Sequence, residues 1–308
     1  MKPMISKQKF LCPLFLISLF FLGINTAVSQ INLGSIENFS IYTSNGAVSN
    51  TGISSITGDV GTNLGAITNF EAPSVLNGSI HNTNSITTQA DSDLNVAVAQ
   101  IIATTTTVSY ADSLHVFGNG EILTAGVYAV STAASLNGTL ILDAQGNDDA
   151  LFIFKIGGAF STTAHANVLL TGCASPTNIF WLTTGAISME TYTNISGNII
   201  SNVGAIGIGS GSIVQGRMLS TTGAISVYGS TINNGSTNPL PTINYWTGAI
   251  SSDWNNEVNW TCGVPSAIPS NDLINIIPVA TTTYPIIRAT PDNSGIAENL
   301  EILSGASL

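Results

Sequence analysis

Residues 184–226 read TGAISMETYTNISGNIISNVGAIGIGSGSIVQGRMLSTTGAIS, and the unit Gly-Ala-Ile recurs within them at a fixed interval. It begins at Gly185, Gly204 and Gly223, so the three copies are equally spaced along the chain. Further copies, some of them looser, are found at 46–49, 65–68, 129–131 and 159–161. A short unit repeated at a constant period of this length is typical of a solenoid, in which each repeat forms one coil.

Two other short patterns keep the same period and fill the rest of each repeat. Gly-x-apolar units occur at 58–60, 78–80, 197–199 and 216–218. A third set of short strands is predicted around Ile195, Ile213 and Ile232, each of which we expect to point inward. Glycine and asparagine between the patterns suit tight turns. The sequence therefore predicts a mainly β fold, a triangular β-solenoid with about 19 residues and three short strands per coil.

The repeat is interrupted once, between about residues 83 and 108. Apolar residues there follow the spacing of one face of a helix: Ala90, Leu94, Ala97, Val98, Ile101 and Ile102. We predict a helix at about 85–103, ended by the β-branched run 104–107. Its apolar stripe needs a partner, and we expect it to pack on the solenoid face whose outward positions include Ile200 and Leu219.

The first 29 residues have the layout of a secretory signal peptide. Three lysines precede an apolar stretch at 10–24, and Ala27-Val28-Ser29 provides a small-x-small cleavage site. The chain that remains carries Lys155, Arg217 and Arg288 against 17 acidic residues, a net charge near −14. That balance disfavours nucleic acid and anionic membranes as partners. We expect a secreted, extracellular protein, with attachment to a cell surface as an open alternative.

Two cysteines lie outside the predicted signal peptide, Cys173 and Cys262. In an oxidising compartment they could pair, and the alternative is a buried, free Cys173 in the apolar stretch 169–181, with Cys262 free or paired elsewhere. Two isolated cysteines lack the spacing of a zinc site, so we predict no metal and no cofactor.

Five stretches of the sequence resemble the secreted ice-binding domain that is found in cold-adapted bacteria, diatoms and fungi. They are Gly126–Tyr128, Leu136–Gly146, Ala150–Ile156, Cys173 with Asn178–Trp181, and Gly216–Ser220. The resemblance runs from about Ile31 to Asn234, and one departure is Ala125, where the family usually has proline. It implies a right-handed, discontinuous β-solenoid with a long helix along one face. It also implies an ice-binding protein that causes thermal hysteresis and inhibits ice recrystallisation.

Strand alternation predicts which side chains would meet the ice. If the central Ile, Val or Phe of each repeat points inward, the flanking residues point outward and stack in rows. The ice-binding residues predicted in this way are Ala47, Ser49, Ala66, Thr68, Ala129, Ser131, Ala159, Ser161, Thr184, Ala186, Ser188, Ala205, Thr222, Ala224 and Ser226. The competing face is the third strand, with Thr193, Ser212 and Thr231 as its outward candidates.

The sequence beyond the solenoid changes character. We expect the ice-binding domain at 30–236, a linker at 237–245 and a partial Trp-rich β module at 246–308, with strands near 275–278, 284–287 and 300–303. The segment Trp246–Trp260 weakly resembles a Trp/Asn-rich module that follows the binding domains of secreted bacterial surface proteins. A strand-like stretch lies close to Leu308, so we expect this segment to be incomplete.

An adhesin that binds glycans or other surfaces is the alternative function, and an enzyme is not predicted. Polysaccharide-cleaving β-helices need clustered carboxylates in a groove. The densest acidic group here, Asp143, Asp148 and Asp149, lies in a Gly-Asn turn context. The histidines, at 81, 115 and 165, have no partner at a motif spacing. We therefore expect the partner to be an ice crystal surface and not a small-molecule substrate.

Overall fold

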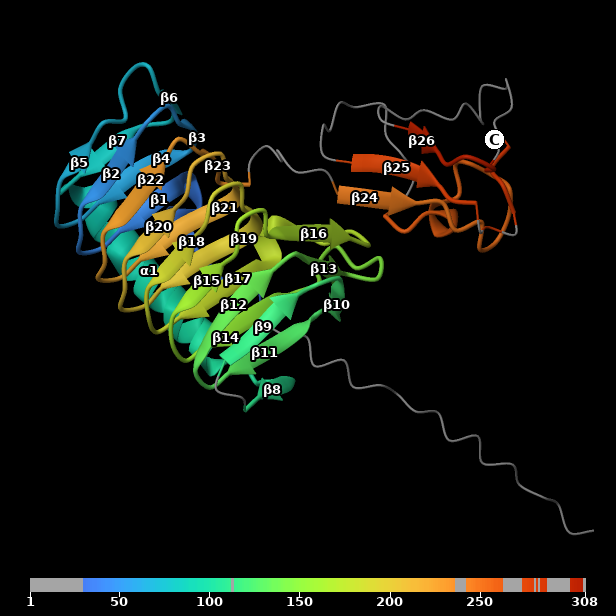
Figure 1. Ribbon diagram of the computed structural model, residues 1–308, viewed down its shortest axis with the longest axis horizontal. Helices are drawn as coiled ribbons and strands as arrows, with labels where there is room; N and C mark the ends of the chain where they lie inside the picture. Colours follow the sequence, from blue (N-terminus) through green and yellow to red (C-terminus); the bar gives the residue numbers. More distant parts are fainter. Residues whose placement is uncertain are drawn as a thin grey trace, which may run out of the picture.

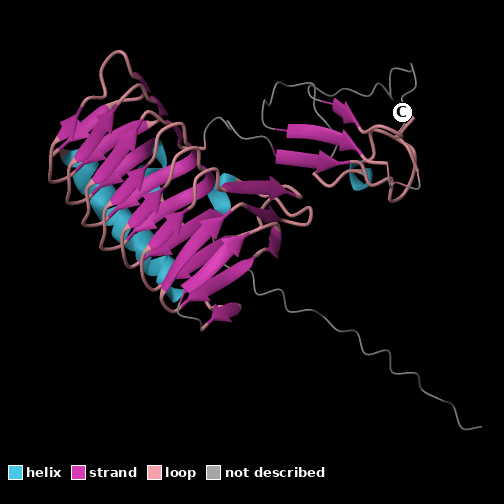
Figure 2. Ribbon diagram, viewed as in Figure 1, coloured by secondary structure: helices cyan, strands magenta, loops and turns pink. Residues whose placement is uncertain are grey.

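The computed structural model describes residues 30–111, 114–235, 242–262, 273–279, 281, 283–286 and 300–306. The predicted signal peptide and most of the predicted linker lie outside the described residues, and so does Arg288. Parallel strands wind into a solenoid with three faces, and one long helix runs along it (Figures 1 and 2). The predicted fold class is therefore confirmed.

The first face, called here the helix face, is a parallel sheet that carries the helix. Its strands run in the spatial order β7 (Ile80–Asn82), β4 (Asp59–Thr62), β1 (Phe39–Thr43), β21 (Ile213–Ser220), β19 (Asn194–Ser201), β17 (Ile179–Thr183), β14 (Phe152–Ile156), β11 (Gly126–Val130) and β8 (Val108–Tyr110).

The second face, the Ala/Ser face, is built from the Gly-Ala-Ile repeats and their counterparts. Its order is β5 (Ile67–Thr68), β2 (Val48–Thr51), β22 (Ile225–Tyr228), β20 (Ile206–Ile208), β18 (Ile187–Met189), β15 (Phe160–Thr162), β12 (Ala133–Asn137) and β9 (Leu114–Gly118).

The third face completes the triangle. It contains β6 (Val75–Asn77), β3 (Ser55–Thr57), β23 (Thr231–Asn233), the first halves of β21 and β19, β16 (Asn167–Thr171), β13 (Thr139–Asp143) and β10 (Glu121–Thr124). Inward side chains of all three faces meet in one apolar core, which includes Val48, Phe154, Trp181, Ile195 and Ile225. On this face Ile195 and Ile232 point inward as predicted, whereas Val214 takes the inward place that we expected for Ile213.

The order of coils in space differs from their order in the sequence. The first coil stacks on the last, because β1 pairs with β21 and β2 with β22. The helix then carries the chain from β7 to the far end, where β8 starts a second run of coils that returns to the middle (Figure 1). This is the discontinuity that the family resemblance implies.

Coil length is less regular than the sequence predicts. The central core residues of β18, β20 and β22 are Ile187, Ile206 and Ile225, which are equally spaced along the chain. The intervals from Ala134 to Phe160 and from Phe160 to Ile187 are clearly longer, although each also spans a single coil. The additional residues form turns, including those around 144–150 and the short helix η2 (Pro176–Asn178). Insertions in exposed turns leave the stacking of the strands unchanged.

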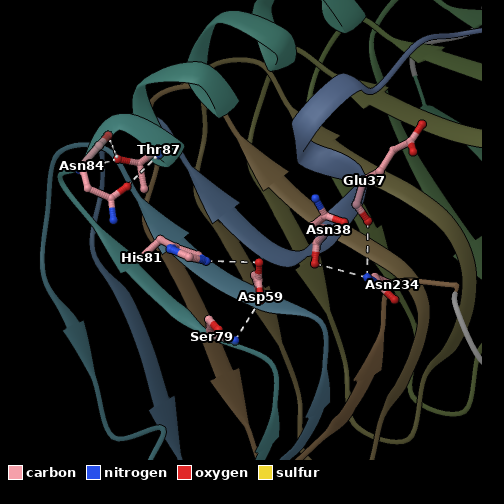
Figure 3. A network of polar contacts seen from close by, with 8 residues as sticks. All are labelled: Glu37, Asn38, Asp59, Ser79, His81, Asn84, Thr87 and Asn234. Atoms are coloured by element: carbon pink, nitrogen blue, oxygen red, sulfur yellow. Dashed lines mark hydrogen bonds and ion pairs between the residues drawn. The ribbon is translucent and has the colours of Figure 1, made fainter.

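Helix α1 (Ser85–Ala103) begins at a capping box and packs its apolar stripe on the helix face. The Asn84 side chain accepts from the backbone N–H of Thr87, and Thr87 Oγ1 accepts from Asn84 N in return (Figure 3). Leu94 and Ile101 are buried in a second core that includes Phe180, Ile200 and Leu219. The predicted docking surface is therefore confirmed, although Ile102 is 57% exposed and lies off the stripe.

The two basic side chains that the structure describes, Lys155 and Arg217, both make hydrogen bonds within the fold. Lys155 Nζ donates to the Thr104 carbonyl at 2.6 Å, at the C-terminal end of α1, where a positive charge is favourable. Arg217 is 6% exposed and donates to the Glu37 carbonyl, at 2.8 Å from Nη2, and to Asn198 Oδ1 at 2.9 Å. Burial lowers the pKa of Arg217 to about 10, so it remains charged at neutral pH. Arg217 thereby holds the short helix η1 (Gly34–Asn38) against the solenoid.

The C-terminal module consists of the described residues from Thr242 onward. A parallel sheet of β24 (Thr242–Tyr245), β25 (Leu273–Ile277) and β26 (Leu300–Ile302) is accompanied by η3 (Glu257–Asn259). Its small core contains Trp246, Trp254, Trp260 and Ile277. Strand β24 lies within the predicted linker, and Ile243 pairs with Thr171 of β16. Within the described part of the chain, no helix is long and apolar enough to cross a membrane.

Candidate functional site

The Ala/Ser face presents one aligned row of outward positions across all its strands. Parallel register aligns the outward residue in the middle of each strand with its neighbours. From one end to the other this Ser column reads Thr68, Ser49, Ser226, Gly207, Ser188, Ser161, Ser135 and Val116. Neighbouring strands of a sheet lie about 4.8 Å apart, which fixes the spacing along the row.

A second row, the Ala column, lies two residues before the first. Its exposed members are Ala66, Ala47, Ala224, Ala205, Ala186 and Ala159. Each of these alanines accepts a backbone hydrogen bond from the next coil, and the six N···O distances lie between 2.8 and 3.0 Å. The Ala column is therefore held by an uninterrupted backbone ladder. Thr184 and Thr222, which begin their repeats, are exposed at the edge of the same face.

The glycine that precedes each alanine has a separate, structural purpose. A Cβ atom added to Gly223 would lie 2.0 Å from the Gly204 carbonyl oxygen, and one added to Gly65 would lie 2.0 Å from that of Gly46. No side chain fits there, because the coils stack too closely. Close stacking thus explains why the repeat contains glycine. It does not explain the alanine, whose methyl group faces solvent.

Buried hydroxyl groups brace one edge of the Ala/Ser face. The residues that end strands of the helix face donate to carbonyl groups of the glycine corner. Thr62 donates to Gly46, Thr43 to Gly223, Ser220 to Gly204 and Ser201 to Gly185, with O···O distances of 2.8 to 3.0 Å. Ser220 and Ser201 also accept from Gly223 N and Gly204 N, both at 2.8 Å. This hydroxyl ladder was not predicted from the sequence, although a Ser or Thr stands shortly before each of these glycines.

The opposite edge of the face is braced in a similar way. Thr162 and Thr193 share a hydrogen bond of 2.7 Å, and Ser212 Oγ accepts from Thr193 N at 2.9 Å. Thr193 is 0% exposed and Ser212 is 1% exposed. Our expectation that these two residues point outward on the third face is therefore wrong, because they line a corner inside the coil. Thr231 is half-buried.

The structure brings together all but two of the predicted residues. Ala129 lies in β11 on the helix face, where it pairs with Lys155, and Ser131 follows it. The equivalent position on the Ala/Ser face is taken by Ser135, which is in register with Ser161 and Val116. The Ala-Val-Ser pattern at 129–131 was misleading because the same short pattern occurs on both the helix face and the Ala/Ser face. The interval from Val116 to Ser135, which equals that between the Gly-Ala-Ile units, was the better signal.

The outward positions of the two columns carry no charge. Glu190 is exposed just beyond the end of β18, at the border of the face. Within the Ser column, the hydrogen bond recorded between side chains joins Ser49 and Ser226 at 3.4 Å. The other hydroxyls of the column are available to water. At the β9 end the two columns finish in apolar residues, since Leu114 is 54% and Val116 43% exposed.

The structure shows the surroundings of the acidic residues and histidines that the sequence singles out. No group of three or more His, Cys, Asp or Glu residues is placed to hold a metal ion in the part of the chain that the structure covers. Asp143 Oδ1 accepts from Gln145 N at 2.9 Å, which is turn chemistry. His81 does have a carboxylate partner, Asp59, at 3.1 Å, and Ser79 N donates to the same carboxylate (Figure 3).

These features define a class of protein: a helix-backed β-solenoid that presents one flat, uncharged and rigidly braced face to solvent. Residues 42–233 match the family model described as ice-binding-like. The chain therefore belongs to the ice-binding-like family.

Individual relatives support this assignment. The chain is 31% identical over 175 residues to an ice-binding protein of Nostoc sp. (strain HG1), a match that covers 57% of this chain and 63% of that protein. The chain thus spans less than two thirds of the Nostoc protein. An ice-binding protein from an Antarctic biological consortium superposes with a TM-score of 0.62 at 32% identity, over 67% of this chain and 91% of that one. One from an Antarctic Flavobacteriaceae bacterium gives 0.63 at 37% identity, over 88% and 62%.

Proposed function

We propose that this protein adsorbs to ice through the Ala/Ser face, causing thermal hysteresis and inhibiting ice recrystallisation. The observation that carries the proposal is the pair of aligned, uncharged columns on a sheet that is braced at both edges. Membership of the ice-binding-like family supports it independently. The proposed contact residues are the predicted ones without Ala129 and Ser131 and with Ser135 added.

The physical case rests on preorganisation. A hydroxyl that exchanges bulk water for ordered water gains little, about 1 kcal/mol at most for each hydrogen bond. Affinity must then come from many contacts that form together without ordering the protein. The backbone ladder under the Ala column and the buried hydroxyls beside it meet this requirement. Exposed methyl groups between the hydroxyls leave water molecules to bond with one another, which favours an ice-like layer.

We further propose that the mature chain is exported and works outside the cell, and that it has no enzymatic activity. The predicted signal peptide supports export. A glycan-binding adhesin is less well supported, because Phe152, Phe154, Phe180 and Trp181 are buried and cannot stack on a sugar, while the exposed aromatic residues of the solenoid include only isolated tyrosines such as Tyr192 and Tyr228. Attachment to a cell surface through the C-terminal module is a separate proposal, which localisation of a tagged chain would test.

The decisive experiment compares one bulky substitution on two faces. Ala224→Tyr places a ring in the middle of the Ala column, whereas Ser55→Tyr places it on an exposed site of β3 in the third face. We expect Ala224→Tyr to abolish most of the thermal hysteresis and Ser55→Tyr to retain it, with both variants folded by circular dichroism. Loss of activity only in Ser55→Tyr would move the site to the third face. Folded wild-type protein that neither shapes ice nor slows recrystallisation would refute the function itself.

A further inference from the structure

The two cysteines left open by the sequence meet where the C-terminal module touches the solenoid. Cys173 lies in the turn after β16, and its thiol donates to the Thr261 carbonyl at 3.1 Å. That carbonyl carbon is bonded to the backbone nitrogen of Cys262. The two thiols also interact electrostatically, since each side chain shifts the pKa of the other. Both thiols are half-buried and neither is part of the Ala/Ser face.

The backbone on each side is held in place independently. Gly146 N donates to the Gly172 carbonyl at 2.9 Å, which fixes the turn that carries Cys173. In the module, Cys262 N donates to Asn244 Oδ1 at 2.8 Å, and Thr261 N donates to the Tyr245 carbonyl at 2.9 Å. A disulfide forms only where the backbone already places the two Cβ atoms close together. Here two separately anchored segments place the Cys173 sulfur 3.1 Å from the Thr261 carbonyl oxygen, in the peptide group that leads into Cys262.

We propose that Cys173 and Cys262 form a disulfide bond that fastens the C-terminal module to the third face of the solenoid. The only other covalent connection between these two parts is the chain at 236–241. The bond closes a loop from 173 to 262 that contains β18, β20 and β22, the centre of the Ala/Ser face. The bond therefore stabilises the Ala/Ser face and keeps the C-terminal module on the third face.

The chemistry needs an oxidant, and the class required is a disulfide carrier, either oxidised glutathione or a thiol–disulfide oxidoreductase. The Cys262 thiolate attacks a sulfur of the carrier, breaks the carrier's S–S bond and releases one thiol. Cys173 then loses its proton to water and attacks the Cys262 sulfur, which releases the second thiol. The two cysteines are oxidised and the carrier is reduced by the same two electrons. The interaction with the Cys173 side chain lowers the pKa of Cys262, against the opposing effect of burial, and so suits Cys262 to the first attack.

The test counts thiols in the chain exported to a bacterial periplasm, where removal of the predicted signal peptide also removes Cys12. It counts them as well in residues 30–308 produced without that peptide and oxidised with a glutathione redox buffer after purification. Unreduced protein is denatured in an alkylating reagent and weighed by mass spectrometry. We expect no alkylation before reduction and two alkyl groups after it. Cys262→Ser is the matched control and should take up one group without reduction. The second arm separates a failure of export from a failure of the bond, because it needs no signal peptide.

A cleavage experiment then shows that the bond joins the two parts. A site for a specific protease is inserted between Gly235 and Thr242. The cleaved protein is then separated on a denaturing gel with and without reductant. We expect the module to stay attached without reductant and to separate with it, whereas in Cys262→Ser it separates in both lanes. Thermal unfolding of the uncut wild type should shift to lower temperature on reduction, to the value of Cys262→Ser. Two freely alkylated thiols in folded, oxidised protein would overturn the proposal, and none of these readouts depends on ice binding.

Discussion

The hydroxyl ladder beside the Ala/Ser face makes a prediction that separates stability from activity. Ser220 is 0% exposed, and its hydroxyl donates to the Gly204 carbonyl at 3.0 Å while accepting from Gly223 N at 2.8 Å. Ser220→Ala removes both bonds and leaves two buried backbone groups without that partner. An unsatisfied buried group costs about 1 to 3 kcal/mol, so we expect the two groups together to lower the free energy of unfolding by about 2 to 6 kcal/mol.

The matched control is the same chemical change on the exposed row. Ser226 lies in the Ser column and is half-buried, and its recorded side-chain hydrogen bond is the 3.4 Å contact with Ser49. Ser226→Ala should therefore change the free energy of unfolding by no more than about 0.5 kcal/mol. Its effect should appear instead in thermal hysteresis, because the hydroxyl that it removes faces water.

Equilibrium urea unfolding monitored by circular dichroism measures the first quantity, and the m-value checks that the unfolding reaction stays the same. Hysteresis is measured on the same preparations near 0 °C, where both variants remain folded. If Ser220→Ala costs no more than an ordinary surface substitution, about 0.5 kcal/mol, the buried hydroxyls do not brace the corner. If Ser226→Ala destabilises the fold as much as Ser220→Ala does, the division into a bracing edge and a working row is mistaken.

Single contacts elsewhere in the fold give three more expectations. A Cβ atom on Gly204 would lie 2.5 Å from Ala186 N, so Gly204→Ala should lower the free energy of unfolding in urea by about 1 to 3 kcal/mol. A Cβ atom on Gly207 would meet nothing within 4 Å. Gly207→Ser should therefore be tolerated, and it should raise thermal hysteresis by completing the Ser column. Lys155→Met removes the charge at the C-terminal end of α1 and should cost about 1 kcal/mol, with Lys155→Arg retaining most of it. Partial burial opposes ionisation of Asp93, but hydrogen bonds from Ser35 and Gln89 outweigh it and lower its pKa. Because the pKa of Asp93 is lower in the folded than in the unfolded state, the ionised carboxylate stabilises the fold at pH values above the unfolded-state pKa of about 3.9. This contribution is lost as the pH falls through the folded-state pKa. The difference in free energy of unfolding between wild type and Asp93→Asn should therefore disappear as the pH falls from about 3.9 through the folded-state pKa, and it should stay constant at higher pH.

Much of the architecture was predictable because every coil of the solenoid must meet the same packing requirement. Each coil needs an inward apolar residue in every strand, and such residues at 187, 206 and 225 gave the period without any knowledge of contacts. The helix was predictable for the same reason, since Leu94 and Ile101 fall on one stripe and must be covered. Its partners Ile200 and Leu219 were recognisable as outward apolar residues.

Other features depend on contacts that no local pattern encodes. The sequence around Ala129 has the form of an Ala/Ser repeat, but the strand pairing assigns it to the helix face. Thr193 and Ser212 look like outward residues of a solvated strand, yet they bond to groups on neighbouring coils inside the corner. Which faces of a three-sided coil are exposed, and where the longer turns fall, is decided by stacking between residues far apart in the sequence.

The pairing of β2 with β22 has a consequence for how the protein is made. Ser49 and Ser226 are neighbours near the β5 end of the Ala/Ser face, but 177 residues separate them along the chain. As synthesis proceeds from the N-terminus, the first two coils have no partner for one edge until the last coil has emerged. Topologies dominated by such distant contacts fold slowly. If the chain is exported, as proposed above, slow folding is an advantage, because a chain that is still unfolded can cross a membrane.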